Sequence, residues 1–117
     1  KDIGAVPVLQ ALDCNGHQII LNTMRSGKEL EDAKDWFAFN HIRLFGANEN
    51  PTQKSWTDSP KVYANLYIDD AAMGCFLCYD PNFHSRAYVD WKETTSYLHA
   101  RGLITYEQHR EIMKSYE

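Results

Sequence analysis

Two stretches with helical periodicity and two short apolar runs alternate along the first part of the chain. Residues 4–13 carry apolar side chains at helical spacing, and residues 26–39 carry a second such stripe that begins with a capping box. The unbroken apolar run Ile19–Leu21 is typical of a strand buried on both faces, and residues 42–45 indicate a second short strand. This helix, strand, helix, strand order predicts a parallel sheet with right-handed crossovers.

A third strand is predicted at residues 66–68, which are apolar and end abruptly in Asp69 and Asp70. A long polar loop, residues 46–60, precedes this strand. The stretch between the loop and the strand, residues 61–65, is long enough for one helical turn. Adjacent carboxylates repel each other unless a cation or hydrogen-bond donors offset the repulsion. The acidic pair therefore favours a divalent metal site, and the alternative is a solvated turn that follows the strand.

The last third of the chain predicts a loop, a short edge strand and two helices. Residues 75–86 have the composition of a loop, and residues 87–89 form the predicted edge strand. Asp90 is the expected N-cap of a helix that ends at Gly102. A capping box then opens a terminal helix over residues 105–117, either a lid over a sheet edge or a partner-binding element.

Composition limits the size and class of the protein. With 117 residues, of which 44% are hydrophobic and 13% aromatic, the chain has the apolar content for one domain that spans residues 1–117. Twelve basic residues against 16 acidic ones argue against general nucleic-acid binding or an anionic membrane surface. No apolar run approaches the roughly 20 residues that span a bilayer, so we expect a soluble, cytoplasmic protein.

Cysteine and histidine give weak metal signals. Cys14, Cys75 and Cys78 are an odd number at spacings that do not suit a disulfide framework. The Cys-x-x-Cys pair with nearby His84 leaves a zinc site or a redox pair open, but a structural zinc ion needs four ligands. We expect reduced thiols in a loop, and surface or turn roles for the five scattered histidines.

Polar groups follow all three predicted strands at the same end. Thr23 follows the first strand, the polar loop follows the second, and Asp69 and Asp70 follow the third. Ligands of open α/β sheets bind at the carboxyl ends of the strands. A hydroxyl and a lysine, either Lys61 or Lys54, suit a phosphate, and two carboxylates suit Mg²⁺.

The order of these segments resembles the haloacid dehalogenase-like (HAD) hydrolases. The resemblance is carried by residues 19–25 (IILNTMR), then Lys61, then residues 66–70 (LYIDD), and it covers the whole chain. It is closest to the small capless group of predicted phosphatases from bacteria and phages. It implies a Rossmann-like α/β fold, a parallel sheet with flanking helices, and Mg²⁺-dependent hydrolysis of phosphomonoesters through an aspartyl-phosphate.

The resemblance also implies roles for individual residues. Thr23 matches the second-motif hydroxyl that binds the transferring phosphoryl group. Lys61 matches the third-motif lysine, with Lys54 as the substitute because the position of this lysine varies. Asp69 and Asp70 match the fourth-motif acids that hold magnesium.

Three further residues are candidates for substrate contact. Asn22 and Arg25 flank Thr23, and Arg25 has two open roles, a clamp on a substrate phosphate or an ion pair with an acid. Trp56, in the polar loop, is expected to pin the loop to the core rather than stack on a substrate.

The sequence lacks the first motif of the family that it resembles. The family carries Asp-x-Asp-Gly-Thr at the end of an opening, central strand, where the first Asp is the nucleophile and the second the general acid and base. Asp2 and Asp13 stand in no comparable context. We expect an incomplete site, inactive unless the opening strand comes from other residues, an oligomer or a partner.

Three functions follow as expectations. The first is a phosphohydrolase with an open site that suits a nucleotide, a phosphorylated nucleic-acid end or another accessible phosphomonoester. The second is a catalytically silent binding or structural protein of the same fold. The third is a reverse transcriptase, because Tyr67-Ile68-Asp69-Asp70 matches the Tyr-x-Asp-Asp hairpin of those enzymes. The polymerase domain of those enzymes needs further acids and a far longer chain.

Overall fold

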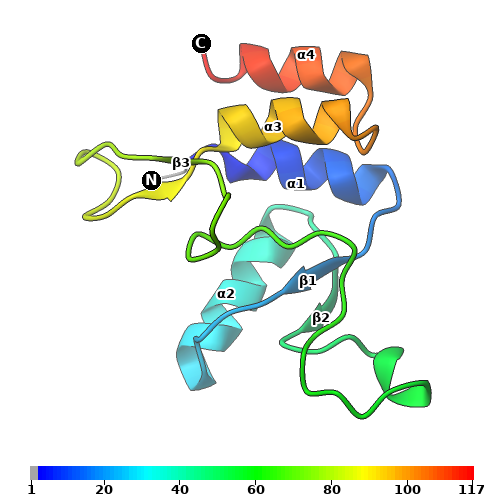
Figure 1. Cartoon of the computed structure of the whole chain (residues 1–117). Coiled ribbons are helices and arrows are strands. Elements are labelled where there is room, and N and C mark those ends of the chain that lie inside the picture. The colour runs from blue at the N-terminus through cyan, green and yellow to red at the C-terminus, as the bar shows by residue number, and fades with distance from the viewer. Residues whose placement is uncertain (1–2) are drawn as a thin grey trace.

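A computed structural model describes residues 3–117, so Asp2 lies outside the described residues. The described chain is a small mixed α/β domain in which a layer of three helices packs beside a second layer of one parallel strand pair and one helix, and a short antiparallel strand pair lies at the end of the helical layer (Figure 1). Its elements, in chain order, are α1 (Ala5–Cys14), β1 (Ile19–Leu21), α2 (Gly27–Phe39), β2 (Leu44–Ala47), the 3-10 helix η1 (Gln53–Ser55), β3 (Leu77–Cys78), β4 (Tyr88–Val89), α3 (Trp91–Ala100) and α4 (Tyr106–Lys114).

The hydrophobic core lies within the helical layer. Helices α1, α3 and α4 stack side by side, although the sequence separates the first from the other two by most of the chain (Figure 1). Val8 and Leu98 are fully buried, and Ile112 closes the core from α4. Because burial of each such side chain contributes about 1.5 to 3 kcal/mol, these three helices supply most of the apolar stabilisation.

Local capping sets the start of α3 and of α4, and a glycine ends α3, as predicted. The Asp90 side chain accepts a hydrogen bond from the Glu93 backbone N–H at 3.0 Å and so caps α3. Thr105 and Gln108 form the predicted capping box of α4, with bonds of 3.1 and 2.9 Å. Gly102 has a φ of +74°, which a glycine adopts without strain, and ends the α3 segment.

The second layer contains the predicted parallel pair. Strands β1 and β2 are parallel, with Ile19 opposite Leu44, so this prediction is confirmed, although β2 begins two residues later than expected. The strand β1 is half-buried rather than buried on both faces. Helix α2 has no buried residue. The Ser26 side chain at its N-terminus makes no capping hydrogen bond, so the capping box predicted for this helix is wrong.

The third predicted strand is wrong. Residues 66–68 are irregular, and the described strands form only two pairs, parallel β1–β2 and antiparallel β3–β4. The Tyr67 hydroxyl donates to the Val62 carbonyl at 2.6 Å and accepts from the Ala64 N–H at 3.1 Å, so the side chain folds back on the preceding backbone. The segment is thereby held by these local bonds and by the packing of Leu66 against the helical core, instead of a ladder. Strand β4 confirms the predicted edge strand, whereas β3 lies in a predicted loop.

A buried carboxylate joins the two layers. Asp13, at the end of α1, accepts a hydrogen bond from the Arg43 backbone N–H at 3.1 Å and one from its Nε at 3.0 Å. The Asp13 side chain is only 12% exposed. The Gln10 side chain adds a bond of 2.8 Å to the Asn40 carbonyl, and Ile42 is buried beside them. The entry of the chain into β2 is therefore fixed by α1.

No helix in residues 3–117 combines the length and the apolar character that crossing a membrane requires.

Replacing Asp13 with alanine should lower the free energy of unfolding by about 1 to 3 kcal/mol, because the part-buried bonds from the Arg43 N–H and Nε lose their acceptor. Urea denaturation followed by circular dichroism measures the change. Asp35→Ala, on the exposed face of α2, is the control and should leave the stability nearly unchanged. Equal effects of the two substitutions would show that the joint does not stabilise the fold.

Candidate functional site

The carboxyl ends of β1 and β2 are tied together by one asparagine. The Asn48 backbone N–H donates to the Leu21 carbonyl at 2.7 Å, and the Asn48 side-chain oxygen accepts from the Thr23 N–H at 2.8 Å. Asn48 has a φ of +57°, in the left-handed region that Asn tolerates better than most residues. It therefore shapes the turn that carries Thr23. No sequence motif marks Asn48, whose only local signal is that it is an Asn that follows an apolar strand.

Thr23 is half-buried, and its hydroxyl is partly engaged. The Thr23 Oγ1 accepts a hydrogen bond from the Arg25 N–H at 3.1 Å, so the hydroxyl hydrogen is still free to donate to a ligand oxygen. Asn22 and Arg25, the neighbouring candidates for substrate contact, are both exposed.

Gln53 organises the polar loop that follows β2. This residue is 7% exposed, and its side-chain nitrogen donates to the carbonyls of Ser59 at 3.1 Å and Lys61 at 2.6 Å. Its side-chain oxygen accepts from the Tyr63 N–H at 2.8 Å. One amide thus binds three points of the following chain and fixes the backbone at Lys61. Its role was not predicted, because a single Gln in a polar loop has no distinguishing sequence signal.

The two candidate lysines differ in their surroundings. The Lys61 ammonium lies 5.3 Å from the centre of the Tyr67 ring, within cation–π distance. Lys54 is exposed on η1. Trp56, just beyond η1, is 59% exposed and packs edge-on against Tyr63 at 5.4 Å. The expectation that Trp56 pins the loop to the core is wrong, because its ring contact is with Tyr63, in the irregular stretch that follows the loop, and leaves much of the Trp56 ring uncovered.

Asp69 and Asp70 lie in an exposed turn. The Asp69 side chain accepts a hydrogen bond from the Ala71 N–H at 2.9 Å. The Asp69 backbone carbonyl accepts one from the Ala72 N–H at 2.9 Å. Asp70 lies 3.7 Å from the Arg86 guanidinium. The turn thus offers one backbone N–H to the Asp69 carboxylate and one cation to the Asp70 carboxylate, which is the solvated-turn alternative considered for this pair.

The predicted site residues are not joined by direct contacts. Among residues 3–117, no hydrogen bond or ion pair links Thr23, Lys61 and the two aspartates to one another. The same residues contain no group of three or more His, Cys, Asp or Glu side chains that could hold a metal ion. Mg²⁺ commonly uses only one or two carboxylates, with waters and substrate phosphates as its other ligands. Asp69 and Asp70 have the right chemistry for that donor set if Asp70 exchanges Arg86 for the ion.

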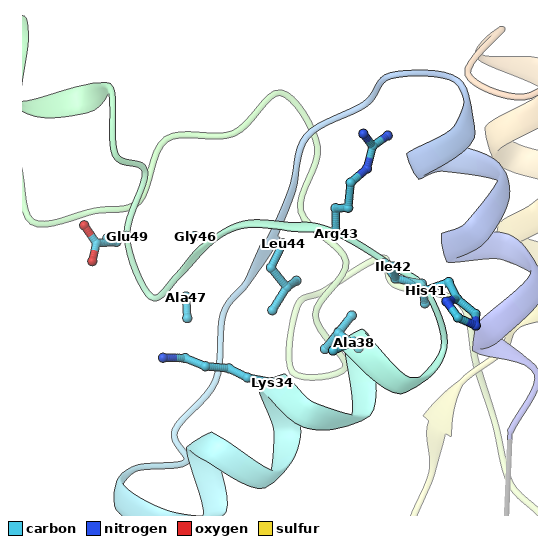
Figure 2. A pocket seen from close by; sticks show the side chains of 10 residues that line it. Lys34, Ala38, His41, Ile42, Arg43, Leu44, Gly46, Ala47 and Glu49 are labelled. Carbon is cyan, nitrogen blue, oxygen red and sulfur yellow. The ribbon is translucent and has the colours of Figure 1, made fainter.

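A separate pocket lies away from these residues. It measures about 750 Å³ and opens between α2 and β2, with Lys34, Leu44 and Gly46 among its lining residues (Figure 2). Its cations are already engaged, since Lys34 pairs with Glu31 at 3.2 Å and the Arg43 guanidinium binds Asp13. None of the predicted site residues lines it. A smaller apolar groove of about 250 Å³ lies beside the acidic turn, between residues 66–76 and α3.

The cysteines are free thiols in the structure. Burial raises the pKa of the Cys78 thiol, and the nearby charges of Asp90 and Asp80 raise it further, whereas a hydrogen bond from Tyr88 lowers it. A raised pKa makes Cys78 a poor thiolate at neutral pH, which disfavours the redox alternative for the Cys-x-x-Cys pair.

Comparison of the chain with protein-family models, with curated proteins and with solved structures found no match.

Asn48→Ala should destabilise the protein by about 1 to 2 kcal/mol, because it removes the acceptor of the Thr23 N–H and places a Cβ-bearing residue without a polar side chain at positive φ. Asn48→Gly relieves the backbone strain but not the lost bond, so it separates the two effects. Hydrogen exchange at the Thr23 amide should accelerate in both variants. Unchanged exchange at Thr23 would contradict the assigned bond.

Cys78 should react with iodoacetamide more slowly than exposed Cys14 at neutral pH, and its reaction should rise only at higher pH. Tyr88→Phe removes the interaction that lowers the pKa of Cys78, so its reactivity profile should move to still higher pH. Peptide mass spectrometry after timed alkylation measures each site separately. A profile that moves to lower pH in Tyr88→Phe would contradict this assignment.

Proposed function

We propose that this chain provides part of a HAD-like, magnesium-dependent phosphohydrolase site on a Rossmann-like sheet. In this proposal Thr23 binds the transferring phosphoryl group, Lys61 neutralises it, and Asp69 and Asp70 hold Mg²⁺. The substrate class is an accessible phosphomonoester, such as a nucleotide or a phosphorylated nucleic-acid end.

The observation that carries the proposal is the tie between the ends of β1 and β2. Thr23 follows the carboxyl end of a strand in a parallel pair, which is where open α/β sheets bind ligands. The Asn48 side chain fixes the Thr23 backbone at 2.8 Å and leaves the hydroxyl hydrogen free to donate. A positioned donor at this edge is well suited to a phosphate oxygen.

Two further contacts support it. The Gln53 amide fixes the backbone of Lys61, and the Tyr67 ring lies under the Lys61 ammonium. The lysine is therefore held beside Tyr67, which comes just before the acidic turn in the sequence. Mg²⁺, when bound, would act as a Lewis acid on a phosphoryl oxygen. Asp69 and Asp70 would supply its protein ligands, and Arg86, released from Asp70, would be available for a substrate anion.

Catalysis in this proposal requires a nucleophile from another segment. The strand β1 pairs only with β2 among the described strands, so its second edge has backbone groups available for a further strand. A strand that ends in Asp-x-Asp would place its carboxylates at the same edge as Thr23. Other residues of the polypeptide, a second copy or a partner would provide that strand.

The second candidate function is a catalytically silent binding or structural protein. The specific observation in its favour is the acidic turn itself, where the Ala71 N–H binds the Asp69 carboxylate and Arg86 lies 3.7 Å from the Asp70 carboxylate without a metal. In this alternative the two aspartates stabilise a turn and the fold serves as a scaffold.

The test combines metal binding with turnover. Mn²⁺, a paramagnetic substitute for Mg²⁺, should bind weakly, broaden the amide resonances next to Asp69 and Asp70, and be displaced by Mg²⁺. The double substitution Asp69→Asn with Asp70→Asn should abolish the broadening, whereas Asp35→Asn on α2 should not. The chain alone should not hydrolyse an aryl phosphate.

Two outcomes decide between the candidates. Broadening that is equal in the wild type and the double variant would refute the metal site and leave the silent protein. Turnover by the chain alone, lost in Asp69→Asn, would support the phosphohydrolase but refute the claim that its nucleophile comes from elsewhere.

A further inference from the structure

The apolar groove beside the acidic turn has three aromatic rings in its walls. The groove measures about 250 Å³, lies between residues 66–76 and α3, and is lined by Tyr67, Phe76 and Tyr97 among others. These three side chains are 45%, 41% and 38% exposed. Leu98, which also lines the groove, is fully buried and belongs to the hydrophobic core. The groove therefore presents partly uncovered rings beside the apolar surface of the core.

The rings are held in place by their own contacts. The Tyr67 hydroxyl donates to the Val62 carbonyl at 2.6 Å. Phe76 and Tyr97 pack against each other with ring centres 5.9 Å apart, and the Arg101 guanidinium donates to the Tyr97 hydroxyl at 2.7 Å. Side chains that are already fixed lose little conformational freedom when a ligand binds. The walls of the groove are therefore preorganised.

One buried hydroxyl that lines the groove has no partner. Thr94, in α3, is 5% exposed, and among the described residues its Oγ1 makes no hydrogen bond. The neighbouring Thr95 hydroxyl, by contrast, donates to the Trp91 carbonyl at 2.6 Å within the same helix. A buried hydroxyl is unfavourable until a hydrogen-bonding group satisfies it. Thr94 thus gives the groove one polar point, which can donate to a ligand or accept from it.

These features suit a planar ring better than an aliphatic group. Ligand sites are typically apolar and aromatic clefts with a few polar groups that fix the orientation of the ligand. The groove is smaller than the roughly 300 Å³ at which sites for drug-sized ligands begin, so it suits a single ring system. Aromatic rings pair favourably in offset or edge-on contact. An aliphatic side chain of a docking protein would cover the three rings but leave the Thr94 hydroxyl unpaired.

The groove adjoins the residues of the proposed phosphoryl-transfer site. Ile68 and Ala72, on either side of the acidic turn, both line it. The Lys61 ammonium lies 5.3 Å from the centre of the Tyr67 ring, which is part of its wall. A phosphate attached to a ring in the groove has a cation and the acidic turn close by, a connection that rests on the proposed function.

We propose that this groove binds a planar aromatic ring that carries a hydrogen-bonding atom, as a nucleobase or a phenol does. The ring packs against Tyr67, Phe76 and Tyr97, and its polar atom pairs with the Thr94 hydroxyl. In the proposed hydrolysis this ring belongs to the leaving group of the phosphomonoester. Binding of the ring by itself requires neither metal nor turnover.

The test is an NMR titration of the isotope-labelled chain without metal, first with adenosine and then with phenol. Both probes should shift the amide resonances of residues 72–76 and 94–98. Cyclohexanol has the hydroxyl of phenol without a planar ring, so it should bind about fivefold or more weakly than phenol. Tighter binding of adenosine than of phenol would support a nucleobase as the ring, and the reverse order would support a phenolic ring.

Two pairs of variants test the assigned contacts. Thr94→Val keeps the shape of the side chain but removes its hydroxyl, so the Kd of the tighter probe should rise about two- to tenfold. Thr95→Val is the matched control and should leave the Kd unchanged, because the Thr95 hydroxyl is used within α3. Phe76→Leu should also raise the Kd about two- to tenfold, whereas Phe39→Leu, at the exposed end of α2, should not. If Thr94→Val does not fold by circular dichroism, the Phe76 pair decides.

Four outcomes are decisive. Cyclohexanol that binds as tightly as phenol, or an unchanged Kd in the folded groove variants, would overturn the proposal. N-acetyl-leucine amide that binds more tightly than either ring would identify an apolar protein side chain as the occupant and would also overturn it. Retained adenosine binding in a chain whose acidic turn shows no Mn²⁺ broadening would support the groove while refuting the metal site, so the two proposals fail separately.

Discussion

The joint between Asp13 and Arg43 is the constraint on which the arrangement of the two layers depends. The helical layer contains the core, whereas α2 buries no residue and β1 and β2 are only half-buried. A two-stranded parallel sheet is marginal by itself. It is held because a nearly buried carboxylate on α1 binds both the backbone and the guanidinium of the residue that leads into β2. The position of the candidate site at the far ends of these strands follows from that attachment.

Side-chain amides organise the irregular part of the molecule. Asn48 ties the ends of the two parallel strands, and Gln53 binds three points along the loop that follows. These bonds stabilise the loop because its backbone groups have no ladder or helix to satisfy them. Phosphoryl-transfer sites rely on positioned donors, so a loop ordered by amides is consistent with the proposed role of Thr23.

The helices and the parallel pair were predictable, and the errors have a common cause. The α3 and α4 caps at Asp90 and Thr105 were correct because capping is local chemistry. Residues 66–68 looked like a strand because they are apolar, but a strand requires a partner, and Tyr67 instead bonds the backbone beside it. The short β3 was missed for the converse reason, since its pairing with β4 rather than its own pattern makes it a strand. Of the candidate site residues, the sequence indicated the chemistry of Thr23 and the acidic turn, but the distances between them depend on long-range packing.

The sequence by itself determined the periodic helices, the caps of α3 and α4, the order of the first two strands and the polar residues at the strand ends. These features depend on neighbours within about four residues, so the pattern of the chain contains them. Tertiary structure decided which elements share the core, the bond of Asp13 to Arg43, and the stacking of His99 on His109 across two helices. Such contacts form only after distant segments have been packed together, and side chains with no sequence motif acquire their roles from that packing.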